Sequence, residues 1–143
     1  MSNNQLNNIN GVIYNNWKHL ELLNVSSNQL TFFDYAMIPQ NLKHLDLHDN
    51  LIEEIGNYYG LENGDLQTLD ISFNRVKQLS KESFLQNLRI INLDQNHISN
   101  VRPHTFDHLK NLSTVYLRGN HLTILPLPSL KVDTAAVETG IHF

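Results

Sequence analysis

The segment Leu42-Lys43-His44-Leu45-Asp46-Leu47-His48-Asp49-Asn50-Leu51-Ile52 decides the fold. Its apolar residues alternate with polar ones around Leu45-Asp46-Leu47, which is typical of a short β-strand with one buried face. An asparagine three residues after Leu47 then precedes another apolar residue, Ile52. One such unit is too small to bury its own apolar face, so further copies are expected along the chain.

The same pattern recurs along most of the chain. The asparagines that define it fall at positions 4, 28, 50, 74, 96 and 120, with spacings that alternate between 24 and 22 residues. Five copies match at every key position, and a partial copy opens the chain, with Met1 in the buried strand position and Asn4 in the asparagine position. The matching positions of the other four full copies are Leu20, Leu23, Val25, Asn28 and Leu30; Leu66, Leu69, Ile71, Asn74 and Val76; Leu88, Ile91, Leu93, Asn96 and Ile98; and Leu112, Val115, Leu117, Asn120 and Leu122.

Stacking these units side by side gives a parallel sheet with apolar columns inside a solenoid. The asparagine amide has both donors and an acceptor, and can satisfy backbone groups that the bend leaves unpaired inside the coil. We therefore expect replacement of Asn50, Asn74 or Asn96 to cost roughly 1–3 kcal/mol each.

The pattern Leu-x-x-Leu-x-Leu-x-x-Asn-x-Leu resembles the leucine-rich repeat family. The resemblance implies an α/β solenoid: a right-handed horseshoe with a parallel sheet on its concave face and irregular turns or short helices on its convex face. We expect a leucine-rich repeat domain over residues 1–130, with about six repeats and an uncapped N-terminus. Residues 131–143 do not fit the pattern and are expected to form a degenerate repeat or a C-terminal tail.

The second half of the repeats resembles the longer-repeat subclass of animal extracellular proteins. An apolar residue follows each asparagine by five positions, and an aromatic often follows by ten, as at Phe84 and Phe106. This resemblance implies a secreted or extracellular receptor fragment with a role in innate immunity or adhesion, as in Toll-like and insect immune leucine-rich proteins. Two alternatives stay open: a cytoplasmic scaffold or regulatory subunit, and a purely structural section of a longer coil.

Composition narrows the function classes. The net charge of -4 gives no electrostatic reason to bind nucleic acid or an anionic membrane. The chain has no cysteine, so disulfides, cysteine-ligated metals and thiol catalysis are excluded within it. It contains neither a signal-peptide pattern nor an apolar run long enough to insert into a membrane. Phosphate loops, catalytic triads and zinc signatures are also missing, so we expect neither an enzyme nor a bound cofactor.

The outward strand positions predict a surface for another protein, through the concave sheet or its edge, in a dimer or a hetero-complex. Parallel stacking places equivalent residues in columns. The first column is Leu22, His44, Thr68, Ile90 and Thr114; the second is Asn24, Asp46, Asp70, Asn92 and Tyr116; the third is Ser26, His48, Ser72, Asp94 and Arg118. From these we predict the partner-binding residues His44, Asp46, His48, Asp70, Asn92, Asp94, Tyr116 and Arg118. Tyr116 and Arg118 are residue types enriched at interface hot spots, and form the expected anchor pair.

Two chemical alternatives were weighed and disfavoured. Asp46 and Asp70 would lie roughly 5 Å apart, near the carboxylate spacing of retaining glycosidases, but an open face has no dry pocket to tune one of them. Around His44, Asp46 and His48, same-face residues are roughly 6.7 Å apart, too far for one metal ion. Five further histidines are expected in solvent on turns or the convex side: His19, His97, His104, His108 and His121.

Two glycosylation sequons begin at Asn24 and Asn111, about the number expected by chance.

Overall fold

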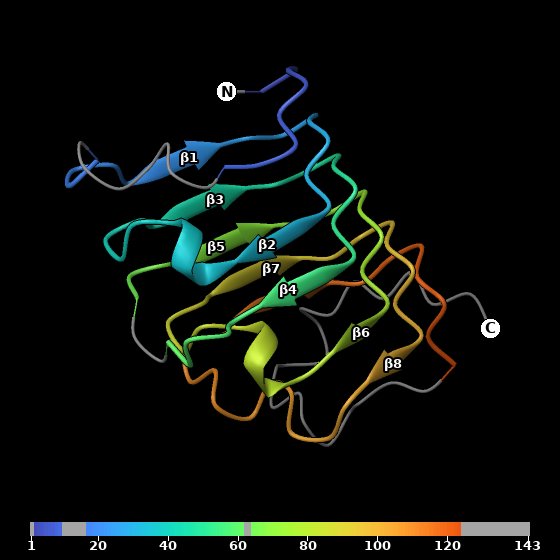
Figure 1. Cartoon of the computed structure of the whole chain (residues 1–143). Coiled ribbons are helices and arrows are strands. Elements are labelled where there is room, and N and C mark those ends of the chain that lie inside the picture. Colours follow the sequence, from blue (N-terminus) through green and yellow to red (C-terminus); the bar gives the residue numbers. More distant parts are fainter. Residues whose placement is uncertain (1, 10–16, 62–63, 124–143) are drawn as a thin grey trace.

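The protein is a parallel solenoid, seen in a computed structural model that describes residues 2–9, 17–61 and 64–123. Its main sheet has five parallel strands in the order β1-β3-β5-β7-β9. These strands are β1 (Leu22–Asn24), β3 (His44–Asp46), β5 (Thr68–Asp70), β7 (Ile90–Asn92) and β9 (Thr114–Tyr116). Figure 1 shows successive coils stacking along one axis, so each strand lies beside the strand of the next repeat. The predicted leucine-rich repeat solenoid is confirmed.

The outer side of the coil is less regular. Two short parallel pairs form there, β2 (Phe32–Asp34) with β4 (Glu54–Gly56) and β6 (Gln78–Leu79) with β8 (Asn100–Val101). Two single-turn 3₁₀ helices, η1 (Tyr35–Met37) and η2 (Lys81–Ser83), complete the described elements. Irregular turns and short helices on the outer side match the expectation from the sequence.

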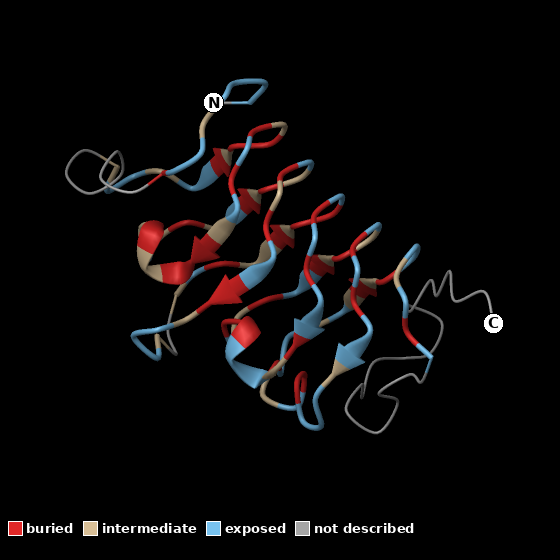
Figure 2. Ribbon diagram, turned by 45° about the vertical axis from the view of Figure 1, so that its right-hand side comes forward, coloured by how far each residue is buried: buried red, intermediate tan, exposed pale blue. Residues whose placement is uncertain are grey.

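The core is a set of apolar columns that run through the stacked coils (Figure 2, red). The middle residues of the five main strands are all 5% exposed or less. They are Leu23, Leu45, Leu69, Ile91 and Val115, and the residues two positions later, Val25, Leu47, Ile71, Leu93 and Leu117, are buried as deeply. Because the strand period is two, the residues between these columns must face away from the core.

Buried asparagines join each coil to its neighbours. The Asn74 Oδ1 accepts the Ile52 N–H of the preceding coil at 2.9 Å, and the Asn74 Nδ2 donates to the Leu47 and Ile71 carbonyls at 3.0 and 3.1 Å. Asn50 and Asn96 repeat this arrangement. Each amide therefore satisfies backbone groups of two coils, as the sequence predicted.

The first asparagine of the series behaves differently. Asn4 holds the asparagine position of the repeat, but it is exposed, and its Nδ2 donates to the Ser2 carbonyl at 2.8 Å. Asn4 precedes the other repeats, and its coil has a neighbour in this chain on one side only. The coil still stacks on the next one, because the Leu6 N–H donates to the Asn28 Oδ1 at 3.1 Å. Met1 and residues 131–143 lie outside the described part of the chain.

The residue before each asparagine has a left-handed backbone. The φ angles are 55° at Asn3, 52° at Ser27, 55° at Asp49, 53° at Phe73, 53° at Gln95 and 67° at Gly119. This turn lets the chain leave the strand and directs the side-chain amide of the following asparagine into the coil. An aromatic residue at such a φ is strained, which makes Phe73 the atypical member of the series.

Candidate binding surface on the concave sheet

The predicted columns exist in the predicted register. Leu22 pairs with His44, His44 with Thr68, Thr68 with Ile90, and Ile90 with Thr114, and the second column runs in the same way from Asn24 to Tyr116. The sheet surface is hollowed by about 330 Å³. The outward-facing residues that line this hollow are Leu22, Asn24, His44, Asp46, Thr68, Asp70, Ile90, Asn92 and Tyr116.

Second-column side chains stabilise the turns that follow their own strands. The Asp46 Oδ1 accepts the His48 N–H at 3.0 Å, and the Asp70 Oδ1 accepts the Ser72 N–H at 2.9 Å. Asn24 and Asn92 accept the equivalent N–H groups at 3.0 and 3.1 Å. Because Asp and Asn both offer this Oδ1, the turn accepts either residue.

The second oxygen of each aspartate is bound by a flanking amide. The Asn24 Nδ2 donates to the Asp46 Oδ2 at 2.7 Å, and the Asn92 Nδ2 donates to the Asp70 Oδ2 at 3.1 Å. Asp46 and Asp70 sit directly opposite each other in the sheet register. Two carboxylates that accept hydrogen bonds on both oxygens and lie in an open hollow are suited to setting surface charge.

The last strand breaks this scheme. Tyr116 occupies the position of the Asn or Asp, so it cannot accept the next N–H in the same way. The Arg118 N–H donates instead to the Asp94 Oδ1 of the preceding coil at 2.7 Å. Tyr116 is thereby available to face the hollow, while Asp94 takes over a structural contact.

The third column is only partly on the surface. Ser26 and Ser72 are 9% and 3% exposed, so the expectation that they point outward from the concave face is wrong. Each short hydroxyl turns back to the residue two positions earlier: the Ser26 Oγ donates to the Asn24 Oδ1 at 2.7 Å and the Ser72 Oγ to the Asp70 Oδ1 at 2.6 Å. His48, Asp94 and Arg118 keep partial or full exposure.

The two concave histidines point along the sheet to the next coil. His44 Nδ1 lies 2.8 Å from the Thr68 Oγ1, and His48 Nδ1 lies 3.0 Å from the Ser72 Oγ. Across the described residues, no group of three His, Asp or Glu side chains is placed to hold a metal ion.

One histidine outside the sheet departs from expectation. His108, expected in solvent, is half-buried, and its Nε2 lies 2.9 Å from the Phe84 carbonyl oxygen.

Several exposed apolar side chains were absent from the predicted site. Leu22 is 60% exposed and Ile90 40% exposed, and both line the concave hollow. Their first-column positions were in the sequence pattern, and treating every apolar residue in an outward column as a candidate would have found them. Tyr58 and Tyr59 lie away from the sheet at 69% and 79% exposure, where the repeat pattern makes no prediction.

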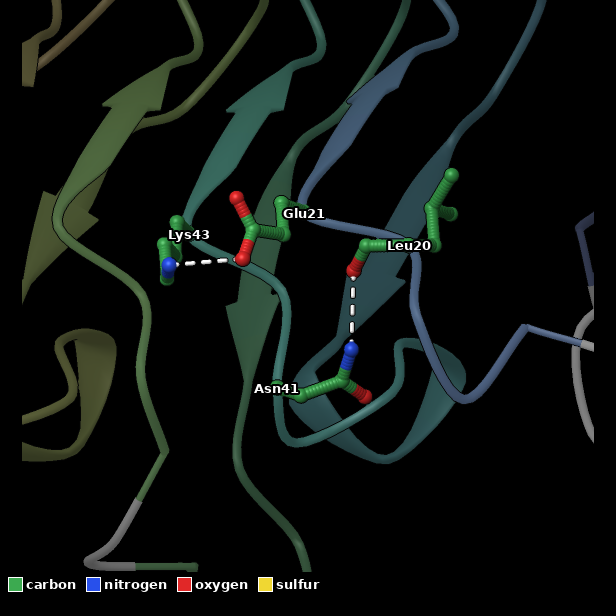
Figure 3. Close-up of polar contacts among 4 residues, drawn as sticks. All are labelled: Leu20, Glu21, Asn41 and Lys43. Carbon is green, nitrogen blue, oxygen red and sulfur yellow. Dashed lines mark hydrogen bonds and ion pairs between the residues drawn. The ribbon is translucent and has the colours of Figure 1, made fainter.

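Polar contacts join the coils where the chain enters the main sheet (Figure 3). The Asn41 Nδ2 donates to the Leu20 carbonyl at 3.0 Å, and the Lys43 Nζ lies 2.7 Å from the Glu21 Oε1. The hydrogen bond and positive charge of Lys43 lower the pKa of Glu21. Both partners are solvent-exposed, so this pair contributes little to stability.

The two sequon asparagines differ in their surroundings. The Asn24 amide nitrogen, the atom that would carry a glycan, donates to Asp46 within the sheet. Asn111 is exposed just before β9.

Comparison with known proteins identifies the family. The models described as "Leucine rich repeat" and "Leucine Rich repeats (2 copies)" match residues 64–122 and 40–85. The chain belongs to the leucine-rich repeat family.

Its relatives include receptors. It is 44% identical to Toll-like receptor 7 of Drosophila melanogaster over 111 residues, which cover 77% of this chain and 8% of that protein. It is 30% identical to leucine-rich repeat-containing G-protein coupled receptor 5 of Rattus norvegicus, over 85% of this chain and 14% of the receptor. This chain therefore spans a small part of the length of these relatives.

A solved structure of a TLR13-ssRNA13 complex has a similar fold. Its TM-score is 0.50 at 25% identity, covering 78% of this chain and 20% of that chain. Within residues 2–9, 17–61 and 64–123, no helix is long and apolar enough to cross a membrane.

Proposed function

We propose that this chain is a section of an extracellular receptor of the Toll-like type, and that its concave sheet binds a protein ligand without catalysis. The observation that carries the proposal is the concave hollow, which combines exposed Leu22 and Ile90 and half-buried Tyr116 with a polar column of fixed geometry. Apolar and aromatic anchors surrounded by oriented polar groups are the usual composition of a protein interface. The similarity to Toll-like receptor 7 supports the receptor class and the immune role.

The charge of the hollow favours a protein over a nucleic acid. A polyanion would have to approach Asp46, Asp70 and Asp94, with Arg118 as the only arginine or lysine in the three described columns. Binding to phosphates requires the opposite balance. The TLR13-ssRNA13 complex has the same fold, but fold alone does not transfer a ligand.

The predicted site residues divide by their contacts. Tyr116 and Arg118, with Leu22 and Ile90 added, are proposed as the anchors, because Tyr and Arg are enriched at interface hot spots and exposed apolar side chains gain free energy on burial. His44, His48, Asp46, Asp70, Asn92 and Asp94 are proposed to set charge and hydrogen-bonding specificity around them. Asn111 is the proposed glycan carrier, since a glycan there leaves the hollow open, whereas one at Asn24 would break its bond to Asp46.

Site-specific photocrosslinking tests the binding surface. A photoreactive phenylalanine analogue at position 116 or 90 should crosslink to one protein partner on cells that display the chain. The same analogue at the exposed outer-face residue Gln78 is the matched control. Crosslinking from position 78 with none from positions 90 and 116 would refute the concave proposal.

Affinity measurements on the captured partner then separate anchors from charge. Tyr116→Ala or Ile90→Ala should weaken binding about tenfold or more. Asp70→Asn keeps the Oδ1 that caps its turn, as Asn24 and Asn92 do, but it removes both the charge and the Oδ2 that accepts the Asn92 amide, so a change in its affinity measures these two losses together. When a signal peptide is fused to the chain, we expect cells to secrete the chain intact with a glycan at Asn111, as for an extracellular protein.

A further inference from the structure

Two tyrosines project into solvent from the turn that follows β4, away from the concave sheet. The Gly60 N–H donates to the Asn57 carbonyl at 3.0 Å, which closes a turn with Tyr58 and Tyr59 at its two corners. Their side chains are 69% and 79% exposed, more than those of the other tyrosines in the described ranges. An enzyme that modifies a tyrosine must reach its phenolic oxygen, so these two side chains are the accessible candidates.

The two tyrosines differ in their contacts. The Tyr58 ring lies 5.8 Å from the Phe32 ring, and its hydroxyl lies 3.5 Å from the Glu54 Oε1. Tyr59 makes neither a hydrogen bond nor a ring contact with any described part of the chain. The Tyr59 side chain can therefore enter the active site of an enzyme without breaking a contact, which makes it the better acceptor.

The backbone below Tyr59 is held in place by side chains. The Asn57 Nδ2 donates to the Leu61 carbonyl at 2.8 Å, while its Oδ1 accepts the Leu61 N–H at 2.8 Å. The buried Asp34 carboxylate accepts the Tyr58 N–H at 2.9 Å. The turn is thus already formed before an enzyme binds it, so little conformational entropy is lost on binding.

The segment that carries this turn is acidic. Residues 51–74 contain five aspartates and glutamates and no lysine, arginine or histidine. Glu54, at the start of β4, is exposed. From η2, Lys81 and Glu82 line a hollow beside the turn, and their opposite charges offset each other. An enzyme with a positively charged active site would therefore be attracted to this segment.

We propose that Tyr59 is a sulfation site for a tyrosine sulfotransferase of the secretory pathway. This inference rests on the proposed extracellular function, because enzymes of this class act on exported proteins. Their donor is a phosphosulfate mixed anhydride, and its anionic groups require a basic active site. The acidic surroundings of an exposed tyrosine meet that requirement.

The reaction transfers one sulfuryl group. The Tyr59 phenolic oxygen attacks the sulfur of the donor, so that a new O–S bond forms. The S–O bond to the donor phosphate breaks, and the phosphate leaves with the bridging oxygen and its electron pair. A base of the enzyme takes the phenolic proton, and nothing is oxidised or reduced. The product is a negatively charged sulfate ester on the outer side of the coil.

Radioactive sulfate labelling in cultured animal cells tests the proposal on the full chain secreted behind a signal peptide. An N-glycosidase first removes any label on glycans at Asn24 or Asn111. The wild-type chain should stay labelled, Tyr59→Phe should lose most of the label, and Tyr58→Phe should keep most of it. Tyr116→Phe on the concave sheet is the matched control and should be labelled like wild type.

Two further measurements identify the group and the acceptor. Mass spectrometry should place the group on Tyr59, and its resistance to phosphatase should distinguish a sulfate from a phosphate. Unmodified chain incubated with a purified tyrosine sulfotransferase and labelled donor should be modified at the same residue.

The outcomes separate this inference from the proposed function. A secreted, glycosylated chain without sulfate on Tyr59 would overturn the inference and leave the receptor proposal standing. A phosphate on Tyr59, or a Tyr59→Phe variant labelled like wild type, would overturn it too. A chain that cells neither secrete nor glycosylate would contradict the extracellular proposal itself, and the sulfation site with it.

Discussion

Replacing Asn74 by alanine tests the physical basis of the solenoid. The Asn74 side chain makes one accepted and three donated hydrogen bonds, all of 2.9–3.1 Å. Two carbonyl groups that accept hydrogen bonds from Asn74 also accept one from a neighbouring asparagine. The Leu47 carbonyl also accepts from Asn50, and the Ile71 carbonyl also accepts from Asn96. The Ile52 N–H donates to the Asn74 Oδ1, and Ile52 is fully buried.

Most of the expected loss of stability in Asn74→Ala therefore comes from the Ile52 N–H, which loses its acceptor. A buried N–H left without a partner costs about 1–3 kcal/mol, and the weakened carbonyl contacts add to it, so we expect a loss of about 2–3 kcal/mol. This is a large fraction of the roughly 5–15 kcal/mol that stabilises a typical domain.

Urea denaturation measures this loss, with unchanged m-values as evidence that the unfolded state is comparable. The matched control is Asn4→Ala, because Asn4 holds the same repeat position but is exposed. Its cost should stay within about 0.5 kcal/mol. Hydrogen exchange should speed up at the Ile52 amide in Asn74→Ala. Equal stability of the Asn74 and Asn4 variants would refute the reasoning.

Three further predictions concern single side chains. Phe73→Asn should raise the free energy of unfolding by about 1 kcal/mol, since asparagine tolerates a φ of 53° better than an aromatic residue does; a destabilised variant in urea would contradict this. Tyr35→Phe should cost about 1 kcal/mol, because it leaves the buried Ser83 carbonyl without the Tyr35 hydroxyl donor at 2.8 Å; an unchanged melting midpoint would argue against that bond. Lys77→Met should raise the pKa of Glu53, which the Lys77 hydrogen bond and charge lower. Because the Glu53 pKa is lower in the folded state than in the unfolded state, the ion pair contributes a small stabilisation at pH values above the unfolded-state pKa. This stabilisation disappears as the pH falls through the folded-state pKa. An NMR titration of the Glu53 carboxyl group that shows the same pKa in Lys77→Met and wild type would contradict this assignment.

The sequence predicted the solenoid well, because its repeat directly encodes burial. Each Leu-x-Leu places two side chains inside, and a register error of one residue would expose both. The strand pairing from Leu23 to Val115 follows from that rule alone. Equivalent residues in the first and second columns were predicted correctly for the same reason.

Contacts that depend on local geometry were less predictable. The burial of Ser72 results from a short hydroxyl turning back to Asp70, and no periodic pattern distinguishes it from His48, which stays half-exposed. The Tyr58–Tyr59 turn lies in the variable outer part of a repeat. In that part of the repeat the chain only has to return to the next strand, and many sequences can do so. The repeat spacing therefore does not predict which residues occupy this turn.

On the concave surface, the side-chain atoms that the fold requires can be distinguished from the charges that are available for binding a partner. Each turn after a strand needs one side-chain Oδ1, and Asn24, Asp46, Asp70 and Asn92 all provide it. The turn geometry therefore does not select between a neutral and a charged residue. Placing two aspartates in direct register costs electrostatic repulsion that an Asn beside an Asp would avoid. The fold offsets part of this repulsion, because the Asn24 and Asn92 amides donate to the Oδ2 atoms of Asp46 and Asp70. If the concave surface binds a protein as proposed, the negative charge that remains in the centre of the hollow favours a basic surface on that protein.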